Sequence, residues 1–150
     1  MSKARFLDGI RSARVELESV LAGCDERALT ERQVPGLEWS AKDVLAHLIG
    51  YDLAVLKAIA DLRATGTWTW GWTAPNFDDW NESQVGPRRA LGYAAVRGEL
   101  DDSRVRLLAE LERWPEVSGP FGRDTWDLEK SPIQWIAPHE RDHAEMIAKL

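Results

Sequence analysis

A histidine pair at helical spacing is the feature of this sequence best suited to chemistry. His139 and His143 lie in a segment with helical periodicity, where residues four apart share one face, so both imidazoles can bind one ion. The third histidine of the chain, His47, lies on the flank of the apolar face of another helical segment. Three neutral imidazoles with an open fourth position are the ligand set of a catalytic zinc site. The histidines therefore predict a divalent-metal site.

The same segment matches a protease motif. It reads His139-Glu140-Arg141-Asp142-His143, which has the H-E-x-x-H pattern of zinc proteases. That motif usually needs a third ligand further along the chain, and only seven residues follow His143, so we do not expect a protease. Glu140 is the candidate general base, because it is next to a ligand. Two plainer interpretations stay open: Glu140 as a solvated surface carboxylate, and histidines satisfied by hydrogen bonds without an ion.

Four helical segments position these residues. Apolar residues recur at steps of three and four over residues 4–22, 40–63, 87–114 and 132–150. Ser40 and Asp43 form a capping-box pattern at the second segment, and Ser131 with Pro132 and Gln134 predicts the start of the fourth. We expect Pro138 to kink that fourth helix just before His139. The pattern predicts an all-α four-helix bundle that forms a single domain over residues 1–150.

The connection between the second and third helices is rich in aromatic residues. Residues 65–86 lack periodicity and contain four of the eight tryptophans of the chain, so we expect an ordered loop rather than a helix or a flexible linker. Its aromatic side chains are candidates for the wall of a substrate pocket: Trp68, Trp70, Trp72, Phe77 and Trp80. Packing of the loop on the bundle, or a contact between two copies, is the alternative.

Composition excludes several classes of partner. The net charge of −6 argues against a nucleic-acid partner, because it repels a phosphate backbone. No segment approaches the ~20 apolar residues of a membrane span, and the amino terminus has no unbroken apolar stretch, so we expect a cytoplasmic protein without a membrane partner. The single cysteine, Cys24, cannot form an internal disulfide.

The sequence WSAKDVLAHLIGY, from Trp39 to Tyr51, carries a family resemblance. It resembles the DinB/YfiT-like superfamily, and most closely its ClbS/DfsB branch, in which W-[ST]-x-[KR]-D-x-[LI]-x-H opens the second helix. The histidine pair on the last helix matches the same family. The resemblance implies a four-helix bundle that holds one zinc or nickel ion on His47, His139 and His143, often as a homodimer. It also implies a role for Asn81, which matches a family asparagine and joins Tyr51 in the predicted substrate pocket.

Three functions follow from these patterns. The resemblance implies a metal-dependent hydrolase, or a transferase that uses a low-molecular-weight thiol, acting on a small molecule in detoxification or resistance. Asp52 or Glu140 would then support the metal site or transfer a proton. Pro138 and Glu140 depart from the pattern of the ClbS-like branch, which argues against its hydrolase activity. A protein that binds or sequesters a small molecule without turnover, and a metal that only cross-links two helices, are the alternatives.

Overall fold

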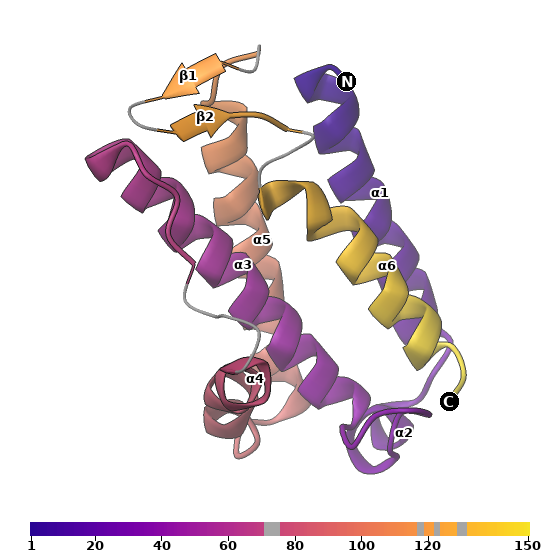
Figure 1. Ribbon diagram of the computed structural model, residues 1–150. Coiled ribbons are helices and arrows are strands. Elements are labelled where there is room, and N and C mark those ends of the chain that lie inside the picture. The colour runs from indigo at the N-terminus through magenta and orange to yellow at the C-terminus, as the bar shows by residue number, and fades with distance from the viewer. Residues whose placement is uncertain (71–75, 117–118, 122–123, 129–131) are drawn as a thin grey trace.

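Four long helices form the body of the molecule (Figure 1). The computed structural model describes residues 1–70, 76–116, 119–121, 124–128 and 132–150. The long helices are α1 (Lys3–Ala22), α3 (Ala41–Thr65), α5 (Tyr93–Glu112) and α6 (Ile136–Ile147). Helix α3 packs along α5 and α1 packs along α6, while contacts of α3 with α6 and of α1 with α5 close the bundle. The predicted all-α class is confirmed.

Short elements connect the long helices. They are α2 (Glu26–Glu31), α4 (Phe77–Val85), the 3-10 turns η2 (Gly86–Arg88) and η3 (Pro132–Trp135), and the strands β1 (Gly119–Phe121) and β2 (Asp124–Trp126). The two strands pair antiparallel and lie at the end of the bundle where α1 begins (Figure 1). With three residues in each strand, this hairpin leaves the fold class unchanged. Within the described ranges, no helix combines the length and apolarity needed to cross a membrane.

The apolar faces of the long helices meet in two clusters. One contains Phe6 and Ile10 of α1 and extends to Leu128 near the hairpin. The other contains Leu17 of α1 and extends to Leu29 of α2. Both clusters take residues from all four long helices, so the stripes predicted from the sequence are buried where they were expected.

The helix that carries His47 has well-defined ends. Ser40 caps α3, because its Oγ accepts the Asp43 backbone N–H at 3.2 Å while the Asp43 carboxylate accepts the Ser40 N–H at 3.2 Å. Gly66 ends the helix with φ 73°, a left-handed conformation that glycine adopts without strain. The predicted capping box is confirmed, and it fixes where His47 stands along the bundle.

Part of the aromatic connection is helical. Residues 77–85 form α4, where an ordered loop was predicted. Asp78 and Asp79 lie in the first turn, where negative charge stabilises the helix N-terminus. Phe77, Trp80 and Gln84 follow a helical spacing, which the surrounding glycine, proline and asparagine residues hide in the sequence.

Two other boundaries differ from the prediction. Gly92 caps α5 and does not weaken its interior, since the segment begins with the η2 turn and the helix proper starts at Tyr93. The fourth segment divides into η3 and α6, so that Pro138 is the third residue of α6. The first four N–H groups of a helix have no partner within the helix, so Pro138 removes no hydrogen bond of α6 and lies in its first turn, where a kink was predicted. Ser131, the predicted cap, lies outside the described residues.

The close approach of α4 to α3 generates a test of the fold. A Cβ at Gly50 would lie 2.5 Å from Gln84 Cγ and 2.6 Å from Gln84 Cβ. We expect Gly50→Ala to lower the free energy of unfolding by about 1 kcal/mol, because an overpacking cost of about 1–3 kcal/mol exceeds the gain of about 1 kcal/mol in helix propensity. Urea unfolding measures the change. Gly98→Ala is the matched control, because that helical glycine has nothing within 4 Å and its substitution should stabilise the protein. Equal changes at both glycines would contradict the close packing of α4.

Candidate metal centre

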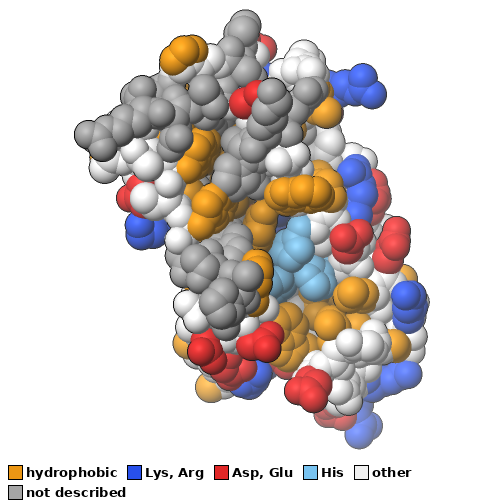
Figure 2. All heavy atoms as spheres, in the orientation of Figure 1, with side chains coloured by type: hydrophobic (Ala, Val, Ile, Leu, Met, Phe, Trp, Pro, Cys, Tyr) orange, Lys and Arg blue, Asp and Glu red, His pale blue; other side chains and the backbone are white. Residues whose placement is uncertain are grey.

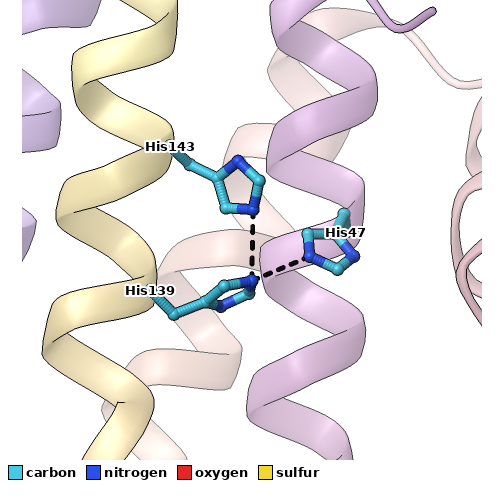
Figure 3. A group of neighbouring side chains, drawn as sticks. All are labelled: His47, His139 and His143. Atoms are coloured by element: carbon cyan, nitrogen blue, oxygen red, sulfur yellow. Dashed lines mark hydrogen bonds between the residues drawn. The ribbon is translucent and has the colours of Figure 1, made fainter. Parts of the chain in front are cut away.

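The three histidines meet between α3 and α6 (Figure 3). His47 comes from the second turn of α3, and His139 and His143 come from successive turns of α6. His139 Nε2 lies 2.9 Å from His47 Nε2 and 3.1 Å from His143 Nε2. Each ring offers one nitrogen to a group whose members all lie within 4.8 Å of one another. The structure thus brings together the three residues predicted as ligands, and they can form a metal site.

The nitrogen arrangement suits an ion better than it suits hydrogen bonds alone. Zinc binds imidazole nitrogen at about 2.0–2.1 Å, so two ligands in tetrahedral geometry are about 3.3 Å apart. The separations of 2.9 and 3.1 Å are close to this value. An imidazole nitrogen carries either one hydrogen or one in-plane lone pair, so His139 Nε2 cannot form a good hydrogen bond to both of its neighbours at once. A divalent ion between the rings would accept all three lone pairs.

The outer face of the histidines has unused polar atoms. The Nδ1 atoms of His47, His139 and His143 are buried and have no hydrogen-bond partner among the described residues, and the same holds for Asn81 Oδ1. Metal-bound histidines usually donate the other ring N–H to an acceptor nearby. The Asn81 side chain lies close enough to His47 to oppose the fall in its pKa, although it forms no hydrogen bond of normal geometry. Asn81 Oδ1 is therefore an available acceptor beside His47.

Burial keeps the imidazoles neutral, which metal binding requires. Desolvation, assisted by the charge of His143, lowers the pKa of His47 to about 4. Desolvation, with smaller contributions from His143, His47 and Arg104, lowers the pKa of His139 to about 2. Desolvation also lowers the pKa of His143, against the opposing charge of Asp142. At pH 7 all three rings are in the form that binds a metal ion.

A cavity of about 1200 Å³ opens over the histidines. Figure 2 shows histidine side chains, in pale blue, in a hollow of the surface, with hydrophobic side chains beside them. The lining residues come from the segment before α3, from α3, from α4 and its preceding connection, and from η3 and α6: Gly36, Leu37, Glu38, Trp39, His47, Tyr51, Trp70, Phe77, Asp78, Trp80, Asn81, Glu82, Gln134, Trp135, Pro138, His139, Asp142 and His143. The histidines are thus accessible to a small molecule.

Most of the predicted pocket residues line this cavity. Tyr51, Trp70, Trp80 and Asn81 are among the lining residues, whereas Trp68 packs against the apolar core and is not. Trp72 lies outside the described residues. Their contact with a substrate stays a prediction.

Two tryptophans of the cavity were not predicted. Trp39, the first residue of the motif that ends near His47, has its ring centroid 5.3 Å from that of His47. Trp135 lies in η3, one turn before His139, and is 58% exposed. Trp135 is four positions before His139, and residues three to four apart share a surface on a helical turn, so that spacing was an available signal. Trp39 is eight positions before His47 and outside α3, so spacing gave no such signal for it.

Aromatic rings also hold the histidines in place. Tyr51 is one turn after His47, and its ring centroid lies 4.5 Å from that of His139. Trp80 of α4 meets His47 edge to face at 6.3 Å. Burial, with a smaller effect of Asp52, raises the pKa of Tyr51 to about 12, so its hydroxyl stays protonated at neutral pH. Rings packed on both faces of the site limit the rotation of the candidate ligands.

Glu140 belongs to a buried ion cluster behind the site. Its Oε1 accepts a hydrogen bond from Arg14 Nε at 2.5 Å, and its Oε2 accepts one from Arg104 Nη1. Arg104 also binds Asp52 in a bidentate manner, with Nε and Nη2 each 3.0 Å from a carboxylate oxygen. Ser103 Oγ donates a longer hydrogen bond, of 3.4 Å, to the same carboxylate. The cluster therefore contains two positive and two negative side chains from four different helices.

This position changes the expectation for Glu140. Its side chain is 0% exposed, so the interpretation as a solvated surface carboxylate is wrong. Both carboxylate oxygens are engaged by arginines, and Glu140 is not among the residues that line the cavity. The general-base role predicted for Glu140 thus has no support in this geometry. Its chemistry here is the neutralisation of buried arginines.

The ion cluster generates a prediction about stability. We expect Glu140→Gln to lower the free energy of unfolding by about 3 kcal/mol, because removing one partner leaves buried charge without compensation. Urea unfolding followed by circular dichroism measures this loss. The control is Glu31→Gln, which removes an exposed carboxylate from a surface pair with Arg27 and should cost less than about 0.5 kcal/mol. A loss for Glu140→Gln as small as that of the control would contradict the proposed structural role.

Comparisons with known proteins agree with this fold. The model of the DinB superfamily matches residues 10–147. The solved structure of ClbS, titled a colibactin self-resistance protein in complex with a dsDNA, is similar with a TM-score of 0.82 at 18% identity, covering 99% of this chain and 95% of that one. The structure titled Sibling Lethal Factor Precursor - DfsB has a TM-score of 0.79 at 18% identity, and the match covers 99% of this chain and 94% of that one. An uncharacterised protein from Clostridium difficile 630 has a TM-score of 0.78 at 12% identity, covering 99% and 95%. No curated protein matches the sequence.

The ClbS structure corrects one expectation. The net charge of −6 led to the prediction that nucleic acid is not a partner. A protein with this fold forms a complex with double-stranded DNA, so that prediction is wrong. Net charge is a sum over the whole surface, whereas binding to a phosphate backbone depends on where the positive side chains gather.

The resemblance first seen in the helix-start motif now extends over the whole bundle. The family model runs from the third turn of α1 to the last residue of α6, and it includes all three histidines of the site. Because this match covers nearly the whole sequence, the chain belongs to the DinB superfamily.

Proposed function

We propose that this protein binds one divalent metal ion on His47, His139 and His143 and uses it to transform a small molecule bound in the cavity. The observation that carries the proposal is the meeting of three buried, neutral imidazoles at the bottom of an aromatic cavity. Zinc and nickel are the candidate ions, since imidazole ligands suit both. A divalent ion there would lower the pKa of a bound water or thiol and so supply a nucleophile at neutral pH.

The residues of the chain have distinct roles in this proposal. His47, His139 and His143 would hold the ion, and all three line a cavity that can admit a small molecule. Tyr51, whose ring packs on that of His139, and Asn81, which lies beside His47, orient the ligands. Asp142 lines the cavity beside His143 and takes the proton-transfer role that Glu140 cannot take from its buried position.

The solved relatives support a protective function. ClbS is described as a self-resistance protein, and its fold is the same as that of this chain. A metal-dependent hydrolase or a thiol-dependent transferase that inactivates a reactive small molecule fits both that description and the cavity. An enzyme of the second kind would need a low-molecular-weight thiol as its second substrate.

Metal content is the first test of the proposal. Protein purified without an affinity tag should contain about one equivalent of a divalent metal, which His47→Ala should lose because two imidazoles do not close the site. Elemental analysis measures the content, and melting with added zinc or nickel measures stabilisation of the folded state. Trp135→Leu is the control, because that exposed residue lines the cavity without offering a ligand. Wild-type protein that holds no metal and gains no stability from either ion would overturn the proposal.

A second test separates an enzyme from a binding protein with a structural metal. In protein loaded with cobalt(II), a small thiol should bind at the open position and produce a thiolate-to-cobalt charge-transfer band, because the histidines leave that position free. The band should be absent in His47→Ala. A cobalt spectrum that no thiol or small anion changes would indicate a closed site, and the non-catalytic function would then be the better interpretation.

A further inference from the structure

The charged side chains that line the cavity all have the same sign. Among the described lining residues there is no lysine or arginine, whereas four are acidic: Glu38, Asp78, Glu82 and Asp142. They come from three separate segments, namely the turn before α3, the helix α4 and the helix α6. All four are exposed, so they face solvent at the cavity, and Asp142 is the one directly beside a histidine, His143.

Three of these carboxylates have no positively charged partner among the described residues. Glu82 pairs with Arg89 through two hydrogen bonds, and that pairing lowers the pKa of Glu82. For Glu38, Asp78 and Asp142, the described part of the chain provides no lysine or arginine within ion-pair distance. Like charges around a concave opening reinforce one another and attract ions of the opposite sign.

The walls between the carboxylates and the histidines are aromatic. They contain four tryptophans and one phenylalanine: Trp39, Trp70, Phe77, Trp80 and Trp135. Phe77 is 46% exposed and Trp135 is 58% exposed, so these two rings present their surfaces to the opening from two different elements. An aromatic face carries negative charge density and attracts a cation placed over it, most strongly over tryptophan.

Polar groups inside the cavity are also unsatisfied. His47 is 7% exposed, it lines the cavity, and its Nδ1 has no partner among the described residues. Asn81 Oδ1 beside it is an unused acceptor. A ligand that fills the cavity would therefore meet an unused acceptor near the histidines and negative charge at the opening.

We propose that the cavity takes a small molecule with a positive charge on a flat, apolar skeleton, such as an aromatic amine or a quaternary ammonium compound. The flat part lies between Trp135 and Phe77, and the positive group lies toward Glu38 and Asp78 at the opening. The uncharged end then points inward to the histidines. That such a molecule binds in the cavity does not depend on the proposed function. That it is the substrate does rest on the proposed function.

A series of three dyes with one ring system tests the charge preference. N-methylacridinium is a cation, acridine is uncharged at pH 8, and acridine-9-carboxylate is an anion. Fluorescence titration of the wild-type protein should give a dissociation constant about tenfold lower for the cation than for acridine, and no measurable binding of the anion. Raising the salt concentration from 0.05 to 0.5 M should weaken the binding of the cation only, because salt screens its electrostatic attraction to the carboxylates.

A pair of double variants ties the preference to this cavity. Glu38→Gln with Asp78→Asn should raise the dissociation constant of N-methylacridinium about threefold and leave that of acridine unchanged. Asp79→Asn with Glu145→Gln is the matched control. Both residues are exposed and lie outside the cavity, and the two substitutions remove the same amount of charge. Trp135→Leu should weaken the binding of both N-methylacridinium and acridine. Equal affinity for cation and uncharged dye, no binding of the cation at millimolar concentration, or equal effects of the two double variants would each overturn the proposal.

The dye titration is independent of the metal. It is carried out on protein treated with a chelator and repeated after addition of zinc. If the protein binds the cationic dye but holds no metal ion, the proposed ligand class is supported and the proposed catalytic function is overturned. Protein that holds an ion at the histidines but does not prefer the cation would give the reverse result, so the two failures are distinguishable.

Discussion

One residue from each long helix joins a buried ion cluster at the middle of the bundle: Arg14, Asp52, Arg104 and Glu140. Along each helix the cluster residue separates the two apolar clusters; on α3, for example, Leu48 lies on one side of Asp52 and Val55 on the other. Such a layer gains little stability over an apolar one, because desolvation of the charges offsets their attraction. It does impose a register, since sliding any one helix would separate a carboxylate from its arginine and leave a charge buried alone. The histidines depend on that register.

The cluster and the site share their helices and part of their electrostatics. Glu140 follows His139 directly, and Asp52 follows Tyr51, whose ring packs on His139. Arg104 contributes to the lowered pKa of His139, so the same positive charge that anchors α3 to α6 also disfavours a protonated ligand. The site thus has a rigid back formed by ion pairs and a front formed by α4 and η3. A metal site needs ligands held within a few tenths of an ångström, and the cluster supplies that constraint from behind.

Local patterns in the sequence predicted the parts of this arrangement that are local in the structure. The capping box at Ser40 and the spacing of His139 and His143 depend on residues within one turn, and both were found as predicted. The burial of Glu140 depends on its ion pair with Arg14, which is 126 positions away in the sequence. Hydrophobic periodicity within a helix cannot predict such a long-range pair. Helix α4 was missed because its helical spacing is short and lies among residues typical of turns. The position of His47 opposite the pair followed from helical phase, and only the packing of α3 on α6 could establish it.

The charge distribution of the cavity is consistent with a neutral ligand set. Three imidazoles contribute no negative charge, so a divalent ion among them would keep its full double charge, which favours a strong effect on the pKa of a bound nucleophile. Carboxylate ligands would reduce that effect, and the acidic residues near the site are indeed absent from the inner group of ligands and gathered at the opening. At that distance they attract a positive group without reducing the charge at the ion by direct coordination. With an ion on the histidines, the separation of neutral donors inside from carboxylates outside would let one cavity activate a nucleophile at its inner end and select a cation at its outer end.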